Sequence, residues 1–112
     1  MKAKTTIDDL NIAAPQPDEC QSLDDIRRGI DAIDGQIIAL LGLRLRYVLN
    51  ATRFKSSEAA IPAPERVAAM LPDRREWSEK AGLSPDFTVP LFAQIIQWFI
   101  QQQIQHWRSK AN

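Results

Sequence analysis

The stretch LDDIRRGIDAIDGQIIALLGLRLRYVLNATRF, residues 23–54, decides the fold of this 112-residue chain. Apolar side chains recur along it in alternating steps of three and four, the pattern of a helix that packs along a narrow stripe. The positions of this stripe, called the seam below, are Leu23, Ile26, Ile30, Ile33, Ile37, Leu40, Arg44, Tyr47 and Ala51. The repeat predicts one helix from about Leu23 to about Phe54, roughly 50 Å long at 1.5 Å per residue.

The segment before this helix has a different character. Residues 1–21 are polar, contain two prolines and show no sustained period, so we expect a flexible N-terminal extension. Ser22 is a typical helix-capping residue, and Asp25 stands three positions later, where an acid completes the cap. The sequence therefore predicts an extension over residues 1–21 and a helical domain over residues 22–112.

Two shorter helices are predicted after a proline-containing loop. Pro64 suits the first position of a helix that ends near Gly82, and Pro72 should kink that helix or split it. Ser84 and Pro85 are typical of the cap and the first residue of a third helix. No useful length of chain alternates with a period of two, so the predicted fold class is all-α.

The long helix presents more apolar surface than two shorter helices can cover. About 30 Å or more of the seam would stay exposed in a monomer. An exposed stripe of that size usually marks an interface. We therefore expect an intertwined homodimer, in which each protomer contributes one long and two shorter helices.

Composition excludes several classes of function. Fourteen Lys and Arg residues balance fourteen Asp and Glu residues, which argues against general attraction to nucleic acid or membranes. Single Cys20 and His106 residues offer neither an internal disulfide nor a set of metal ligands. The N-terminus lacks the apolar core of a secretory signal, and no apolar run could span a bilayer. We expect a cytoplasmic protein that needs no metal or cofactor.

Several polar side chains occupy positions where apolar ones are expected. Arg44 stands in the seam, Arg27 and Lys55 border it, and Gln103 interrupts the apolar stripe of the third helix. Arg44 could extend along the seam to solvent or pair with a buried acid, but Asp34, the nearest flanking acid, is nearly three turns away. A buried cation without an internal partner needs an external anion. A small dicarboxylate would bind Arg27 and Arg44 through paired hydrogen bonds.

Two side chains of the second helix receive ordinary structural interpretations. Arg74 belongs to a run of mixed charges, RREWSEK, that is typical of a solvent-exposed face. Trp77 is more typical of a core aromatic than of a ligand platform.

The chain resembles a known family. One long helix with two cationic positions and a late Gln in the third helix is similar to the all-α chorismate mutases. Within that family, RFKSSEAAIPAPERVAAMLP (residues 53–72) and LFAQIIQWFIQQQIQHWR (residues 91–108) closely resemble the isochorismate–pyruvate lyases of bacterial salicylate synthesis. The resemblance covers about residues 22 to 108.

The resemblance implies roles for four residues. The family's first-helix arginine, which reaches into the partner protomer's site, falls on Arg27, and its second arginine falls on Arg44. The lysine of the mobile loop falls on Lys55, and the glutamine of the third helix falls on Gln103. These residues would bind isochorismate, a dicarboxylate, and promote its cofactor-free pericyclic cleavage, with Arg44 and Lys55 catalytic. The expected apolar walls of the pocket are Val48, Met70 and Ile100.

Two other functions stay open at this point. A chorismate mutase would use a similar site, either as the main or as a side activity. Mutases of this fold carry polar groups early in the second helix, where this chain has Pro64, Val67 and Ala68, which favours the lyase. A non-catalytic dimerisation or regulatory module could use Arg44 and Lys55 for nucleic acid or an acidic partner. Zero net charge and the seam placement count against that alternative.

Overall fold

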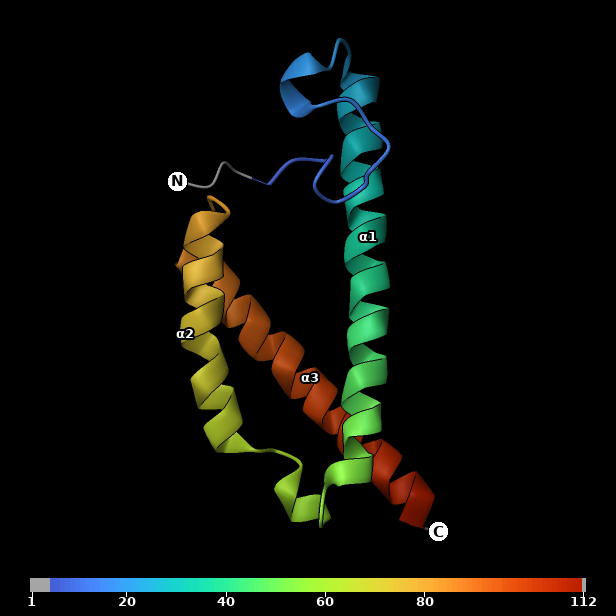
Figure 1. The fold of residues 1–112 in the computed structure, drawn as a ribbon, viewed down its shortest axis with the longest axis vertical. Helices are drawn as coiled ribbons and strands as arrows, with labels where there is room; N and C mark the ends of the chain where they lie inside the picture. Colours follow the sequence, from blue (N-terminus) through green and yellow to red (C-terminus); the bar gives the residue numbers. More distant parts are fainter. Residues whose placement is uncertain (1–4, 112) are drawn as a thin grey trace. The chain divides into compact units, whose positions relative to one another are not determined.

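The computed structural model describes residues 5–111 and gives this part of the chain a helical fold (Figure 1). Its α-helices are α1 (Leu23–Asn50), α2 (Pro64–Lys80) and α3 (Pro85–Ala111). Since no β-strand occurs among the described residues, the prediction of an all-α fold with three helices is confirmed. Of the two helices predicted to be shorter, α2 has 17 residues, but α3 has 27 and is nearly as long as α1, which has 28. The chain divides into two units, Met1–Leu43 and Arg44–Asn112.

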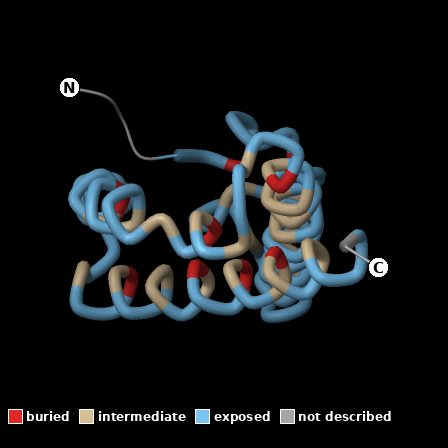
Figure 2. The backbone as a smooth tube through the Cα atoms, turned by 90° about the horizontal axis from the view of Figure 1, so that it is seen from below, coloured by how far each residue is buried: buried red, intermediate tan, exposed pale blue. Residues whose placement is uncertain are grey.

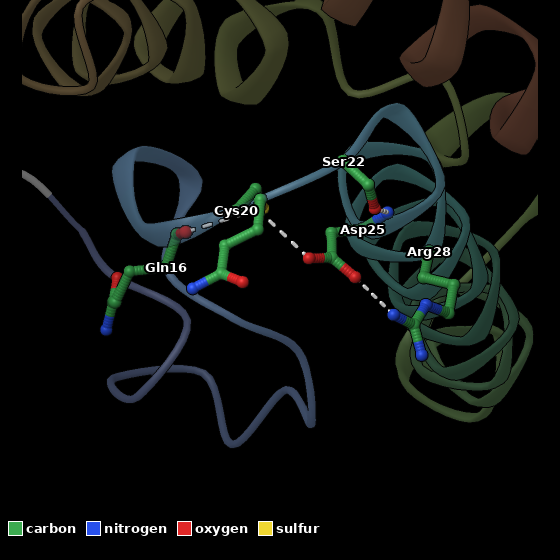
Figure 3. A network of polar contacts seen from close by, with 6 residues as sticks. Gln16, Cys20, Ser22, Asp25 and Arg28 are labelled. Atoms are coloured by element: carbon green, nitrogen blue, oxygen red, sulfur yellow. Dashed lines mark hydrogen bonds and ion pairs between the residues drawn. The ribbon is translucent and has the colours of Figure 1, made fainter.

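In the first unit, α1 begins with the cap that its sequence predicts. The Ser22 Oγ accepts a hydrogen bond from the Asp25 N–H at 3.1 Å, and the Asp25 carboxylate accepts one from the Gln21 N–H at 3.0 Å. Asp25 also pairs with Arg28, one turn further along the helix (Figure 3). The hydrogen bond from Gln21, followed by that from Arg28, holds the pKa of the Asp25 carboxyl below its usual range. These contacts satisfy N–H groups that have no partner inside the helix.

The predicted N-terminal extension has ordered features within its described part. Pro17–Glu19 form a short 3₁₀-helix, η1, and Ile7 and Ile12 are buried. Residues 1–4 of the predicted extension and residue 112 of the predicted domain lie outside the described residues. The boundary between residues 1–21 and 22–112 therefore stays a prediction.

The long helix ends earlier than the seam predicted. α1 ends at Asn50, and the next four residues form the 3₁₀-helix η2 (Ala51–Phe54). The Thr52 Oγ donates a hydrogen bond to the Leu49 carbonyl at 2.7 Å, an alternative to the regular helical pattern. Lys55 follows in an extended conformation and begins the loop toward α2.

The second helix is continuous through Pro72, so the expected split does not occur. A proline inside a helix removes one hydrogen bond and costs about 3 kcal/mol. Met70 and Ser78 are buried on either side of it. Burial on both sides of Pro72 and the packing of α2 against α3 oppose this cost.

The core of the second unit lies along one side of α3 (Figure 2). The buried residues of α3 are Thr88, Ile96, Phe99 and Gln103, and Thr52, Ile61, Met70 and Ser78 are buried in the other segments of this unit. Both α2 and η2 pack against α3, and a short 3₁₀-helix, η3 (Glu58–Ala60), interrupts the loop between them. No helix within residues 5–111 combines the length and hydropathy that a bilayer crossing requires.

The apolar seam of α1 stays exposed. Six of its large apolar side chains are exposed: Leu23, Ile26, Ile30, Ile33, Ile37 and Leu40. None of the residues of α1, which the structure describes throughout, is buried. This is the surface that the predicted homodimer would cover, and the dimer itself stays a prediction.

Candidate active site

A cavity of about 390 Å³ lies within the second unit, a size typical of small-molecule sites. Its walls come from the end of α1, the start of η2 and the loop after it, α2 as far as Arg74, and the middle of α3 from Ile96 to Gln103. The large aliphatic and aromatic side chains around it are Tyr47, Val48, Ile61, Val67, Met70, Ile96, Phe99 and Ile100. The three side chains predicted as apolar walls, Val48, Met70 and Ile100, are all among them.

The charges around this cavity have one sign. Four cationic side chains line it: Arg44 from α1, Lys55 from the loop, and Arg66 and Arg74 from α2. Within the part of the chain that the structure describes, no Asp or Glu lines it. Like charges repel one another, and burial removes the water that would stabilise them. The cavity is therefore suited to an anionic ligand.

Arg44 is held in place by an aromatic ring and has an unused donor. Its guanidinium carbon lies 4.5 Å from the centre of the Phe99 ring, in cation–π contact. Its Nη1 is buried and has no hydrogen-bond partner among the described residues. Burial, and then the charges of Arg74 and Arg66, lowers the pKa of the Arg44 guanidinium. An arginine pKa lies so far above neutrality that the group stays charged.

Gln103 is fixed by a hydrogen bond across the cavity wall. Its Nε2 donates to the Val48 carbonyl at 2.8 Å, and the residue is only 6% exposed. A side-chain amide has a second N–H and a carbonyl oxygen, which this contact does not use. Gln103 therefore presents a pre-oriented amide to a ligand in the cavity.

Lys55 reaches the cavity from the loop. Its Nζ donates a hydrogen bond to the Ala60 carbonyl at 3.4 Å, within the same loop. An ammonium group has three donors, so a ligand can bind without breaking this contact. The bond also couples the position of the ammonium to the conformation of the loop.

The structure thus places Arg44, Lys55 and Gln103 around one cavity, although the sequence separates them widely. Arg27 lies on the part of α1 that belongs to the first unit, and its side chain is exposed. Its predicted role in a partner protomer's site stays a prediction. Among residues 5–111, no group of three or more His, Cys, Asp or Glu side chains is placed to hold a metal ion.

Two arginines of this site were missed by the sequence analysis. Arg74 does not belong to a fully solvated face: its Nε is buried and has no hydrogen-bond partner within the described chain. Its guanidinium carbon lies 4.8 Å from the centre of a Trp77 ring, and Trp77 is 54% exposed rather than a core residue. The available signal was spacing, since Arg66, Met70 and Arg74 recur every four residues on one helical face. The charged residues around Arg74 made this spacing difficult to recognise.

Comparisons with known proteins agree with this architecture. The family model for chorismate mutase type II matches residues 26–104. The chain is 59% identical over 93 residues to a Pseudomonas aeruginosa protein named isochorismate pyruvate lyase, a match that covers 83% of this chain and 92% of that protein. It is also 42% identical over 67 residues to the T-protein of Haemophilus influenzae, covering 59% of this chain and 18% of that protein. The T-protein of Enterobacter agglomerans is 33% identical over 73 residues, covering 64% of this chain and 20% of that protein.

Proposed function

We propose that this chain, which belongs to the chorismate mutase type II family, is an isochorismate pyruvate lyase that converts isochorismate to salicylate and pyruvate. The observation that carries the proposal is the cavity with four cations and, among the described residues, no carboxylate. Isochorismate combines two carboxylates with a carbon ring and an enolpyruvyl side chain. The cationic and apolar parts of the wall match these two features of the substrate. Identity to the Pseudomonas protein over most of both chains supports the choice of substrate.

The proposed reaction is a pericyclic elimination within the substrate. A ring hydrogen moves to the methylene carbon of the enolpyruvyl group while the ether C–O bond breaks. The ring becomes aromatic and remains as salicylate, and the side chain leaves as pyruvate. Such a step needs a substrate held with its side chain folded over the ring, which is the kind of restriction that a shaped cavity supplies. Val48, Met70 and Ile100 would enclose the carbon skeleton.

The polar residues would then stabilise the charges of the substrate and of the transition state. Arg44 would bind a carboxylate through its unused Nη1 donor. The Lys55 ammonium would lie near the breaking ether bond, where negative charge accumulates on oxygen. Gln103 would donate its second N–H to the same region or to a carboxylate. Because Lys55 belongs to a loop, substrate binding would order that loop over the cavity.

The proposed assembly is a homodimer with sites shared between protomers. Pairing of two α1 helices would cover the exposed seam, and Arg27 of one protomer would reach the other protomer's cavity. Replacing Ile30 with Glu should therefore yield monomers in sedimentation experiments and abolish turnover. A variant that stays dimeric and active would exclude the α1 seam as the interface. A cytoplasmic location stays a prediction, and we propose that the salicylate formed serves siderophore synthesis.

The test is product analysis with the purified protein, given isochorismate and chorismate in separate reactions. Salicylate and pyruvate should form together in equal amounts from isochorismate. Replacing Lys55 with Ala should lower kcat by about 100-fold or more, the effect of removing a transition-state donor. Replacing Arg44 with Ala removes the proposed carboxylate donor and should weaken substrate binding. Arg46→Ala is the matched control, because Arg46 lies two residues further along α1 and is exposed.

Other products would decide between the remaining functions. Prephenate from chorismate, formed alongside salicylate from isochorismate, would measure a mutase side activity, which membership of the family favours. Prephenate alone would assign the protein to the mutases. No product from either compound would contradict an enzymatic role for the cavity.

A further inference from the structure

We propose that Arg74 is a ligand-binding residue of the cavity, which together with Arg44 binds a single carboxylate from two sides. The inference rests on the proposed function for its ligand, a dicarboxylate with a ring. It goes beyond that function because the sequence predicted no role for Arg74 in the site. Two observations carry it: Arg44 and Arg74 line the same cavity, and each has a buried donor without a hydrogen-bond partner among the described residues.

The unused donors are unusual for buried polar groups. Arg44 Nη1 and Arg74 Nε are both buried, and neither has a hydrogen-bond partner among the described residues. Most buried side-chain donors in folded proteins are paired, because an unpaired donor loses its bond to water without replacement. Both arginines line the same cavity, so one anion in that cavity can pair with both donors.

The charges of Arg44 and Arg74 also favour an anion bound between them. The charge of Arg74 acts on Arg44 more strongly than that of Arg66, and both lower the pKa of Arg44 after the effect of burial. Two guanidinium groups close enough to repel, in a wall where the described residues provide no acid, are destabilising until an anion enters. A carboxylate between them replaces repulsion with two charge-assisted hydrogen-bonded contacts.

Aromatic stacking also orients the Arg74 side chain before a carboxylate binds. Its guanidinium stacks on the Trp77 ring at 4.8 Å, as that of Arg44 stacks on Phe99 at 4.5 Å. Aromatic stacking restricts a long, flexible side chain before the ligand arrives, which lowers the entropy lost on binding. Arg66 lies two turns before Arg74 on α2, about 12 Å along the helix axis, and its side chain is exposed. Arg74 is therefore the better partner of Arg44.

The first experiment measures binding without catalysis. Isothermal titration with phthalate, an aromatic dicarboxylate, compares the wild-type protein with Arg74→Gln, Arg74→Lys and the exposed neighbour Arg75→Gln. Arg74→Gln should weaken binding about tenfold or more, and Arg74→Lys should restore it only in part because a lysine lacks the planar fork. Arg75→Gln should change affinity by less than about twofold, since Arg75 lies on the solvent side of α2. Unchanged affinity in Arg74→Gln, or an equal loss in Arg75→Gln, would overturn the proposal.

The second experiment needs no ligand and separates a binding role from a structural one. Arg74→Gln is made in the wild-type protein and in an Arg44→Gln background, and thermal unfolding is measured for all four proteins. If the two arginines repel each other, Arg74→Gln should raise the stability of the wild type more, or lower it less, than it does in the Arg44→Gln background. Equal effects in both backgrounds, or a larger loss in the wild type, would contradict the inference.

Steady-state kinetics with isochorismate then test the proposed lyase function and the proposed role of Arg74 separately. Arg74→Gln should raise KM about tenfold or more and change kcat less, because the contact forms already in the bound substrate. A wild-type protein that releases no salicylate would refute the lyase function, while the phthalate and stability measurements would still test Arg74. Full lyase activity with an unchanged KM in Arg74→Gln would refute the role of Arg74 alone.

Discussion

Glu58 and Arg108, fifty residues apart in the sequence, form a two-point ion pair. Arg108 Nε donates to Glu58 Oε1 at 2.6 Å, and Arg108 Nη2 donates to Oε2 at 3.2 Å. Glu58 begins η3, in the loop that carries Lys55, and Arg108 lies in the last turns of α3. The pair therefore attaches the loop of the proposed catalytic lysine to the helix that carries Gln103.

Breaking this ion pair should weaken catalysis without removing any group from the cavity. Glu58→Gln and Arg108→Gln should each lower kcat/KM by roughly two- to fivefold, the small effect expected of an exposed pair. The double variant should be little worse than either single one, because both changes remove the same contact. Exchanging the charges, with Glu58→Arg and Arg108→Glu combined, should recover activity. Fully additive losses would indicate that the two residues act separately.

The same pair should make stability depend on pH in the acid range. The hydrogen bond from Arg108, together with its charge, holds the pKa of the Glu58 carboxyl below its usual range. The stabilisation is therefore present above the pKa of an unfolded glutamate, about 4.3, and is lost as the pH falls through the lower pKa of the folded state. The stability difference between wild type and Glu58→Gln, measured by urea unfolding, should shrink below about pH 4.3. A difference that grows in acid would contradict this assignment.

Gln103 should matter for both stability and activity. Gln103→Leu removes the donor to the Val48 carbonyl and should destabilise the fold by about 1–2 kcal/mol. Turnover of isochorismate should fall about tenfold or more, because the amide that faces the cavity is also lost. Gln101→Leu makes the same chemical change at an exposed position of α3 and serves as the control. Unfolding in urea and kcat/KM measure the two effects, and wild-type activity in Gln103→Leu would refute a role in the site.

Ile61 should be the most sensitive apolar position of the loop before α2. It is only 2% exposed and lines the cavity, so Ile61→Ala should destabilise the fold by about 2–4 kcal/mol. Ile38→Ala removes the same atoms from a residue that is 70% exposed and should change stability by less than about 0.5 kcal/mol. Chemical denaturation measures both values. Equal effects at the two positions would show that Ile61 is not packed as described.

Ala63 occupies a backbone conformation that favours glycine. Its φ of 41° and ψ of 61° are left-handed, at the residue that caps the start of α2. This conformation costs a residue with a side chain about 1–2 kcal/mol, and the greater freedom of an unfolded glycine offsets part of any gain. Ala63→Gly should therefore leave stability unchanged or raise it by up to about 1 kcal/mol. Ala63→Val should lower it, and a stable Val variant would contradict the strained geometry.

The periodicity of apolar residues and the capping residues were enough to predict where each helix begins, because both act over a few neighbouring residues. Ser22 and Asp25 mark the start of α1, and Pro64 and Pro85 begin α2 and α3 at the predicted residues. The end of α1 and the continuity of α2 across Pro72 were less predictable. At both places local preference competes with packing against α3, which no local pattern reports.

The sequence by itself determined the fold class and singled out Arg44, Lys55 and Gln103, which the structure places around one cavity. A charge inside an apolar stripe is visible without coordinates because its burial needs an explanation. Only the tertiary structure decided that Arg66 and Arg74 line the same cavity and that Glu58 binds Arg108. These residues stand among other charges, where polar side chains are expected, so their position in space, rather than their place in a pattern, distinguishes them.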